Sequence, residues 1–203
     1  METTQSHFHQ WSGVISFILI YSIALFFMPF YKKINKKPSL AYVAFIIAFA
    51  VEMHGIPLSM YFISWIIGKK LPEGFLWGHT LFTKIGHTGM YINVFCVIIA
   101  MILIINGWYN IYHKYWSLEK KDRLLVKNGI YKLIRHPQYS GFILLTIGMI
   151  IEWATLPMLL MWPIIVMLYY KLAKKEEKDL IEEFGEEYIM YMKKTKRFIP
   201  YIL

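Results

Sequence analysis

The chain has 203 residues, of which 57% are hydrophobic and 17% are charged, and its formal net charge is +9. Its mean hydropathy of +0.43 excludes an ordinary soluble domain, because the apolar residues come in blocks long enough to cross a bilayer. The positive charge does not indicate nucleic-acid binding, because the apolar blocks leave no separate basic domain to carry such a site.

Five apolar segments follow one another along the chain, at 13–31, 39–67, 88–107, 139–153 and 157–170. The last two are short and lie only a few residues apart, which favours a tight helical hairpin. We therefore expect an all-α polytopic membrane protein in the lipid bilayer. It would have about five transmembrane helices, the last two a short hairpin, and a cytoplasmic carboxyl-terminal helix.

The first apolar segment is predicted to stay in the protein as a membrane helix. Residues 1–12 contain no Lys or Arg, the segment is too long for a signal core, and no small-residue cleavage site follows it. The single cysteine, Cys96, lies inside the third segment, so the sequence holds no disulfide framework. We expect Cys96 to be a small core residue.

Charge asymmetry between the loops predicts the orientation in the membrane. The loop at 32–38 contains four Lys and no acid, and the loop at 111–138 contains five Lys and two Arg against two acidic residues. The loop at 68–86 has only three Lys, and residues 1–12 have none. By the positive-inside rule the first and third loops are cytoplasmic, which places the amino terminus outside and the carboxyl terminus in the cytoplasm.

The second segment contains an ionisable stretch, "VEMHGIPLSMY", inside its apolar run. Glu52 and His54 would lie on nearly opposite sides of a regular helix, and Gly55 and Pro57 can kink that helix. Either the two side chains bond to neighbouring helices, or they line a cavity for the substrate, since intramembrane ionisable residues often mark function. A metal site would need ligands from further segments, and we predict no metal.

The fourth segment begins with the triplet Arg135, His136 and Pro137. Proline favours the first position of a helix and biases the residue before it out of the helix, so His136 is predicted to cap a helix that Pro137 opens. The backbone amides of 138–140, with Arg135 beside them, would then form an anion site at the cytoplasmic boundary. Two tyrosines that can hold a sulfonium on their ring faces flank this site: Tyr131 and Tyr139. A basic residue followed by proline is also common where a chain enters the membrane, so the triplet is either an anion site or an ordinary boundary signal.

The tail from residue 171 is rich in charges of both signs and contains no apolar run of spanning length. One helical stripe runs through it, with these members: Leu172, Glu176, Leu180, Phe184 and Tyr188. This periodicity predicts that Glu176 faces the apolar bundle and that Glu177 faces water. An inward carboxylate needs a cationic partner, which is either a lysine of the chain or a bound ligand.

Two stretches, "LLVKNGIYKLIRHPQYSG" (124–141) and "EEKDLIEEFGEEYIMYMKKTKRFIP" (176–200), resemble the membrane methyltransferases of the isoprenylcysteine carboxyl methyltransferase family. They are also similar to the phospholipid methyltransferase relatives of that family. The resemblance covers about 116–200, with the motifs in the family's order and spacing. The chain has no glycine-rich turn after a strand, which is the pattern of soluble methyltransferases.

The resemblance implies S-adenosyl-L-methionine as the methyl donor, bound at the cytoplasmic face. It would place these residues around the donor: Arg123, Leu124, Leu125, Val126, Tyr131, His136, Pro137, Gln138, Tyr139 and Glu176. In that set, 136–139 would form the helix start that receives the amino-acid end of the donor, and Glu176 would bind it. Arg135 would be the catalytic residue that orients the nucleophile or screens its charge. The chain 1–203 would be one membrane domain, with a three-helix part at 1–110 and a cofactor-binding part at 111–203.

Two positions depart from the family pattern. Arg123 stands where members commonly carry histidine, and Leu172 stands where eukaryotic members carry an arginine linked to the substrate. A carboxylate acceptor on a prenylated protein would therefore lack a cationic partner at position 172.

The predicted function is that of an integral membrane methyltransferase acting on a lipid-like or membrane-partitioned acceptor. The acceptor group is a carboxylate, as in the isoprenylcysteine enzymes, or alternatively a phospholipid amino group or a small thiol. Glu52 and His54 are the candidate substrate-binding residues. A small membrane transporter that uses the broken second segment is an alternative of another class, although the two halves of the chain show no internal repeat.

Overall fold

The computed structural model describes residues 9–27, 37–70 and 87–200 of the chain. The described residues are helical apart from turns and short extended links, and they form no strand beyond one isolated parallel bridge between Ile134 and Lys196. The α-helices, in chain order, are α1 (Trp11–Ser22), α2 (Lys37–Ala50), α3 (Leu58–Ile67), α5 (Thr88–Ile111), α6 (Pro137–Glu152), α7 (Leu156–Phe184) and α8 (Glu186–Lys194). Shorter 3₁₀ and π turns are η1 (Ile23–Phe27), η2 (Val51–Gly55), η3 (Tyr112–Trp116), η4 (Lys120–Asp122) and η5 (Gly129–Lys132). The all-α prediction is confirmed for the described residues.

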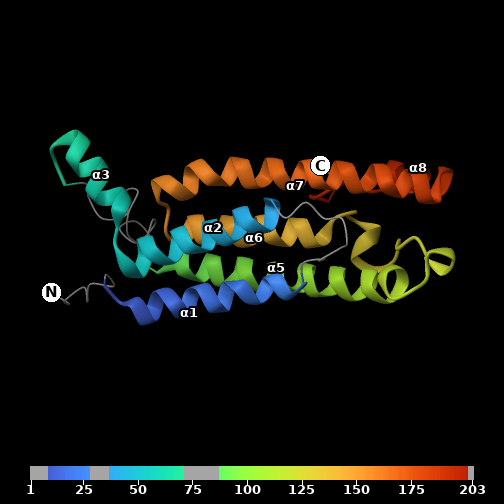
Figure 1. The fold of residues 1–203 in the computed structure, drawn as a ribbon, viewed down its shortest axis with the longest axis horizontal. Helices are drawn as coiled ribbons and strands as arrows, with labels where there is room; N and C mark the ends of the chain where they lie inside the picture. The colour runs from blue at the N-terminus through green and yellow to red at the C-terminus, as the bar shows by residue number, and fades with distance from the viewer. Residues whose placement is uncertain (1–8, 28–36, 71–86, 201–203) are drawn as a thin grey trace.

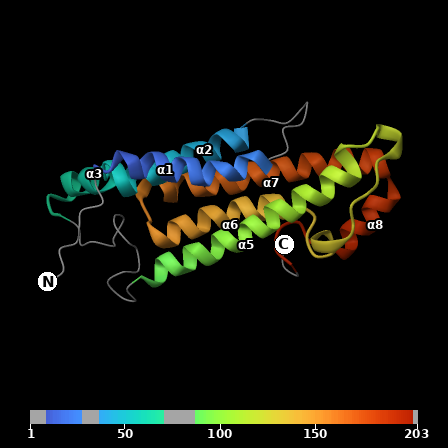
Figure 2. The same cartoon turned by 90° about the horizontal axis from the view of Figure 1, so that it is seen from below.

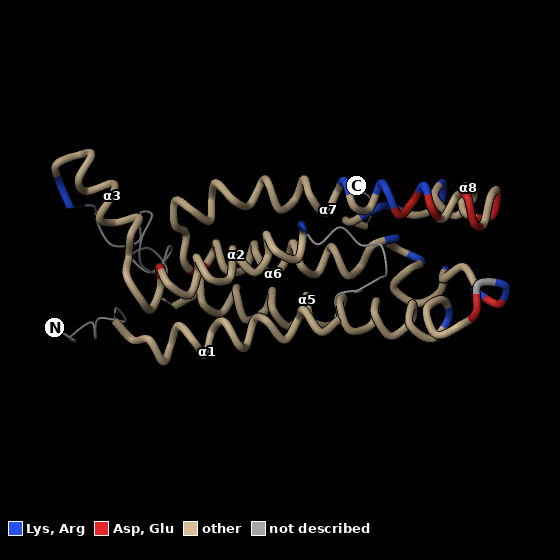
Figure 3. Tube along the Cα trace, in the orientation of Figure 1, with Lys and Arg blue, Asp and Glu red and all other residues tan. Residues whose placement is uncertain are grey.

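Five of the helices, α1, α2, α5, α6 and α7, run side by side along the long axis of the molecule (Figures 1 and 2). The α3 helix projects at one end, and α8 lies at the other end beside the short turns that connect α5 to α6. Figure 3 shows that the charged residues of the described chain gather mostly at the α8 end, over the last turns of α7 and the α5–α6 connection. The remaining length of the bundle is almost free of charge.

Aromatic and aliphatic side chains from α2, α6 and α7 form the centre of the bundle. Tyr42, Phe142 and Tyr169 are fully buried there, and the rings of Phe142 and Tyr169 stack with centroids 5.8 Å apart. Large apolar side chains also cover the outer faces, where Phe95 and Trp65 are largely exposed. A soluble protein would not leave such faces open to water, so they suit contact with lipid.

The seam between α5 and α6 is unusually close. A side chain at Gly141 would bring its Cβ within 2.8 Å of the backbone oxygen of Ala100, and one at Gly107 would meet Pro137 at 3.0 Å. Small residues allow helix backbones to approach in this way inside membranes. The seam therefore holds the first turn of α6 directly against α5.

Three helical stretches of the described residues are long and apolar enough to cross a membrane: Lys37–Gly55, Thr88–Trp116 and Leu156–Phe184. Two further apolar stretches, Trp11–Phe27 and Leu58–Ile67, are shorter. The expected hairpin of the fourth and fifth segments is present as α6 and α7, joined at 153–155. The count of five spans stays a prediction.

The second apolar segment, expected as one membrane helix with a kink, is divided in two. A π turn at Val51–Gly55 ends α2, Ile56 is extended with φ −122° and ψ 119°, and α3 starts after Pro57. The carboxylate of Glu52 accepts hydrogen bonds from the backbone amide of Ser59 at 3.0 and 3.2 Å and from its hydroxyl at 3.0 Å. Glu52 thus caps the start of α3, as an acidic group does at a helix amino terminus.

The fifth apolar segment and the first part of the charged tail form one helix, with no break at residue 171. A single helix, α7, continues for 29 residues to Phe184, although it contains Pro163. Gly185, whose φ of +55° is rarely adopted by other residues, then separates α7 from α8. The tail therefore begins as an extension of a membrane helix, and only Glu186–Lys194 forms a helix of its own.

Candidate active site

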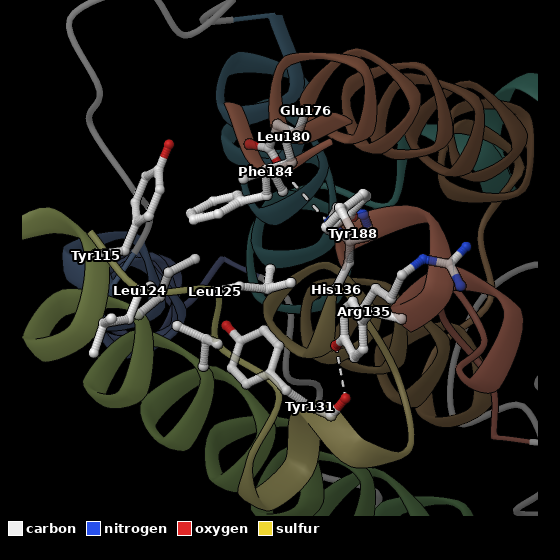
Figure 4. Close-up of a pocket in the computed structure, with 13 residues that line it drawn as sticks. Tyr115, Leu124, Leu125, Tyr131, Arg135, His136, Glu176, Leu180, Phe184 and Tyr188 are labelled. Atoms are coloured by element: carbon white, nitrogen blue, oxygen red, sulfur yellow. Dashed lines mark hydrogen bonds and ion pairs between the residues drawn. The ribbon is translucent and has the colours of Figure 1, made fainter. Parts of the chain in front are cut away.

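A pocket lies at the α8 end of the bundle, where the connection between α5 and α6 folds against α7 (Figure 4). Its lining residues are Ile111, Tyr115, Leu124, Leu125, Val126, Tyr131, Arg135, His136, Glu176, Leu180, Phe184, Tyr188 and Tyr191. In Figure 4, Glu176, Leu180 and Phe184 lie across the cavity from Tyr131. The walls are mainly apolar and aromatic, with charged groups confined to one end.

The apolar wall comes from an extended stretch after α5. Leu124 is held to η3, the π turn that follows α5, by its backbone amide, which donates to the carbonyl of Lys114 at 3.0 Å. Val126 is buried, and Tyr131 is anchored by its hydroxyl, which donates to the carbonyl of Gly107 at 3.0 Å. Burial also raises the pKa of Tyr131 above its usual value, so this hydroxyl stays protonated. The wall is thus attached to α5 through Tyr131, whose carbonyl also accepts from the hydroxyl of Tyr191 on α8 at 2.6 Å.

The start of α6 forms as the sequence predicts. His136 occupies the cap position and Pro137 is the first helical residue. The expected set of three open amides is wrong in part, because the amide of Ser140 donates to the carbonyl of His136 at 3.1 Å. The amide of His136 itself donates to the carbonyl of Arg197 at 3.1 Å, so the carboxyl-terminal segment lies over the helix start.

Glu177 occupies the centre of a buried ion network, which corrects the prediction that it faces water. Its side chain is only 4% exposed. One carboxylate oxygen, Oε1, accepts from Nε of Arg135 at 2.8 Å, and the other, Oε2, accepts from Nη2 of Arg197 at 2.5 Å. Because two guanidinium groups share this one carboxylate, Glu177 carries no uncompensated negative charge.

Glu176, by contrast, lines the pocket with a side chain that is 31% exposed. The hydroxyl of Tyr139 donates to Oε1 of Glu176 at 2.5 Å. The Nδ1 atom of His136 lies 3.4 Å from Oε2 of the same carboxylate. No Lys or Arg of the described chain forms an ion pair with Glu176 within 4 Å. The pocket therefore presents a carboxylate whose only ionic partner there is an imidazole.

His136 lies between the two adjacent glutamates. Its Nδ1 faces Glu176, and its Nε2 lies 3.4 Å from Oε1 of Glu177. Burial of the ring disfavours the charged form, but the two carboxylates outweigh burial, so the pKa of His136 is raised above its usual 6.5. The charge of the imidazole thus depends on both carboxylates.

Arg135 is not open to an external anion in this arrangement. Besides Glu177, its guanidinium donates to the carbonyls of Met192 and Thr195. At the other end of the pocket, Arg123 pairs with Glu183 at 3.5 Å and lies over the ring of Tyr115 at 4.7 Å. Arg123 is therefore not one of the residues that line the pocket, although it contacts Tyr115, which is.

The structure brings seven of the predicted site residues into the pocket lining: Leu124, Leu125, Val126, Tyr131, Arg135, His136 and Glu176. Tyr139 reaches the site through Glu176, whereas Pro137 and Gln138 pack against α5. Glu52 and His54 do not line the pocket; His54 is buried against the ring of Phe17 at 4.5 Å. Among the described residues, no three His, Cys, Asp or Glu side chains are placed to hold a metal ion.

Sequence reasoning missed Arg197, Glu177 and Tyr191. Leu180, Phe184 and Tyr188 were on the predicted stripe, and all three do line the pocket. The spacing of three residues between Tyr188 and Tyr191 was a usable signal for a second inward position on α8. Arg197 gave no such signal, because the tail around it is uniformly basic.

Comparison with known proteins places these features in a family. Residues 83–187 match the family model described as phospholipid methyltransferase. The protein-S-isoprenylcysteine O-methyltransferase of Saccharomyces cerevisiae is 31% identical over 126 residues, which are 53% of this chain and 50% of that protein. The Mus musculus enzyme of the same name is 26% identical over 171 residues, which are 83% of this chain and 58% of the mouse protein. The chain thus spans about half the length of the curated relatives it matches.

Two further similarities bear on chemistry and fold. The methanethiol S-methyltransferase of Pseudomonas deceptionensis is 36% identical over 75 residues, which are 35% of this chain and 26% of that protein. The solved structure of the eukaryotic intramembrane Ras methyltransferase ICMT aligns with a TM-score of 0.50 at 21% identity, covering 99% of this chain and 70% of that one. The fold is therefore that of an intramembrane methyltransferase, and the chain belongs to the phospholipid methyltransferase family.

Proposed function

We propose that the protein is an integral membrane methyltransferase that uses S-adenosyl-L-methionine and methylates a lipid-like or membrane-partitioned acceptor. The observation that carries this proposal is the charge pattern of the pocket. Glu177 is neutralised by two arginines, while Glu176 presents a partly exposed carboxylate to the cavity. A zwitterionic amino acid that bears a sulfonium is complementary to such a site.

The residues present fit this donor. The aromatic and apolar lining of the pocket suits an adenine ring and a sulfonium. Glu176 would bind the ammonium group, and Leu124, Leu125 and Val126 would lie along the nucleoside. Tyr131 would close the cavity beneath it. When bound, the sulfonium supplies an activated methyl group for in-line displacement.

The protein would then contribute alignment and exclusion of water rather than acid–base chemistry. A carboxylate or thiolate needs no general base at the moment of attack, whereas a protonated amine would need one. Arg135 cannot swing freely toward a nucleophile, because it is 8% exposed and is bound to Glu177. In catalysis, Arg135 would contribute with His136 to the electrostatic potential of the site, and it would not bind the acceptor directly.

A small thiol is the second candidate acceptor. Position 172, where eukaryotic relatives carry a substrate-linked arginine by the resemblance noted above, is a leucine that packs against the hydrophobic core. A carboxylate acceptor would find no cation there, whereas a thiol or an uncharged lipid group needs none. Family membership and the pocket argue against the transporter alternative, because a donor pocket at the bundle end has no use in transport.

The proposed membrane arrangement keeps five spans: α1 with η1, α2 with η2, α5, α6 and α7. The amino terminus would be outside, and the pocket end, with α8 and most of the described charge, would be cytoplasmic (Figure 3). Residues 1–110 would then form the three-helix membrane part, and 111–203 would form the cofactor-binding part. A soluble donor would reach the pocket from the cytoplasm, and the acceptor would reach it from the bilayer.

Binding of radiolabelled S-adenosyl-L-methionine to the purified protein in detergent tests the proposal. We expect wild type to bind, and Glu176→Gln to bind about tenfold more weakly, the loss of at least about 1.5 kcal/mol for a charge-assisted hydrogen bond. Glu182→Gln is the matched control, because Glu182 is exposed on the same helix. Absence of binding by wild type, or equal binding by Glu176→Gln, would overturn the assignment. A screen of native lipids, prenylcysteine analogues and small thiols would then identify the acceptor.

A further inference from the structure

Residues Thr195–Phe198, close to the end of the described chain, cross the start of α6 as a carboxyl-terminal strap. The strap pairs with the chain before α6 through a parallel bridge between Ile134 and Lys196. The amide of Arg135 donates to the carbonyl of Lys196 at 2.8 Å, and the hydroxyl of Ser140 donates to the carbonyl of Phe198 at 2.7 Å. These backbone contacts fix the strap's position independently of its side chains.

Arg197 is the strap residue whose side chain turns into the site. Its Nε lies 3.1 Å from Oε1 and 3.2 Å from Oε2 of Glu177, and its Nη2 lies 2.5 Å from Oε2. Its guanidinium also lies 4.9 Å from the centre of the Tyr170 ring. With Arg135 on the other oxygen, this contact holds Glu177 from two sides, and such two-point geometry is specific to arginine.

The arrangement matters because one imidazole faces two adjacent carboxylates. Without Arg197, Glu177 would keep Arg135 as its one guanidinium partner, and its negative field at His136, 3.4 Å away, would be less compensated. That field favours the protonated imidazole, and a proton on His136 also pairs with Glu176, which lies 3.4 Å from the other ring nitrogen. A cationic ligand would then meet a carboxylate that is already paired.

We propose that Arg197 is a positioning residue that acts through Glu177. By compensating Glu177, it allows His136 to release its proton and leaves Glu176 charged for a cationic ligand. The inference rests on the proposed donor site and adds to it a residue that lines no part of the pocket. Arg197 thus sets the charge state of the site without touching the ligand.

The charge of His136 also depends on the other ionisable groups that surround it. The charged and titratable groups that face it or act on it from the packed elements are Arg135, Tyr139, Glu176, Glu177, Tyr188, Tyr191 and Arg197. The tyrosines of α8 have pKa values raised by burial and stay neutral near pH 7. Within this set the removal of Arg197 therefore changes one charge, and the change reaches His136 through Glu177.

The test is the pH dependence of S-adenosyl-L-methionine affinity, measured by calorimetry from pH 6 to 9. Affinity should rise with pH as His136 loses its proton, and Arg197→Gln should move the midpoint upward by roughly one pH unit. At pH 7 the affinity of this variant should fall severalfold. Arg197→Lys, which keeps the charge but loses the two-point contact, should show about half the shift.

Lys196→Gln is the matched control, because Lys196 is exposed in the same strap and its backbone contacts remain. It should leave both the midpoint and the melting temperature unchanged. The ligand's own ammonium titrates equally in every variant, so only the differences between variants report on His136. If Arg197→Gln does not fold, Arg197→Lys decides the question.

An unshifted midpoint in the folded Arg197 variants would overturn the inference, even if their melting temperatures fall, because a purely structural role would lower stability alone. A wild-type protein that binds no S-adenosyl-L-methionine at any pH would instead overturn the proposed function. The two failures are therefore distinguishable.

Discussion

Replacing Glu177 by glutamine tests the ion network most directly. The change keeps the size and shape of the side chain but removes its charge. Arg135, 8% exposed, and Arg197, 18% exposed, would then share a neutral amide with one acceptor oxygen, and its NH2 group would face the second guanidinium, donor against donor. Two partly buried cations would be left without a counter-charge beside the helix start of α6.

The expected cost is large for a single substitution. Breaking a buried ion pair by removing one partner costs about 3–5 kcal/mol, and the remaining carbonyl of glutamine places Glu177→Gln near about 3 kcal/mol. For a chain of this size, about 1 kcal/mol corresponds to a change of about 2–4 °C in melting temperature. Glu177→Gln should therefore melt about 6–12 °C below wild type in the same detergent.

Glu176→Gln is the contrast, since it is the neighbouring residue with the same chemistry. Its side chain is 31% exposed and has no arginine partner, so its melting temperature should stay within about 2 °C of wild type. Thermal unfolding followed by intrinsic fluorescence measures both variants. Equal shifts, or a larger shift at Glu176, would refute the reasoning that the two arginines depend on the charge of Glu177.

Two further predictions concern pH and topology. Because the pKa of His136 is raised in the folded protein, its contribution to stability is present below pH 6.5 and is lost as pH rises through the raised value. The melting temperature of wild type should thus fall as pH rises above 6.5 through the raised pKa, and it should fall less in His136→Gln; an identical pH profile in the variant would contradict this. For topology, Cys96 is the single cysteine and is buried, so Lys69→Cys and Lys121→Cys provide single labelling sites at exposed positions. An impermeant maleimide added to intact cells should label the variant at 69 and not the one at 121, and the reverse pattern would contradict the proposed orientation.

The start of α6 could be predicted from the sequence because its cause is local. A proline fixes its own backbone angle and restricts the residue before it, whatever surrounds them. The carboxyl end of α3 is equally local, since Gly68 adopts a left-handed φ of +70°. Features of this kind depend on one or two residues, and sequence patterns report them directly.

The division of the second apolar segment could only be anticipated as a kink. Its composition stays apolar from 39 to 67, so hydropathy alone gives one span. The break depends on a capping contact between Glu52 and Ser59, seven residues apart, and on packing of the π turn against α1. Contacts of that kind are absent from any periodic pattern.

The error at Glu177 has a different physical origin. A stripe assumes that a helix has one buried face, but this part of α7 has the pocket on one side and the strap on another. Adjacent positions on a helix are about 100° apart, so Glu176 can face the pocket while Glu177 faces the strap. The strap is held mainly by backbone bonds, which leave no pattern in the sequence, and Arg197 is hidden among other basic residues.

The link between the bundle and the site lies in the α5–α6 seam, and glycine substitutions along it test that link. A side chain at Gly141 would place Cβ within 2.8 Å of the carbonyl oxygen of Ala100, and one at Gly148 would overlap Asn93. Overpacking of this kind costs about 1–3 kcal/mol, so Gly141→Ala and Gly148→Ala should each lower the melting temperature by about 4–8 °C at the middle of that range.

The two positions differ in their distance from the pocket along α6. Gly141 lies in the second turn after the His136 cap, so pushing α6 away from α5 there should also displace His136 and weaken S-adenosyl-L-methionine binding. Gly148 lies two turns further on, and its variant should bind nearly as wild type once folded. Gly55→Ala, whose Cβ would approach no atom closer than 3.4 Å, is the control for adding a methyl group to a buried glycine. If both seam variants lost affinity equally, or if neither did, the seam would not position the site, and the helix start of α6 would have to be held by the strap and η5 alone.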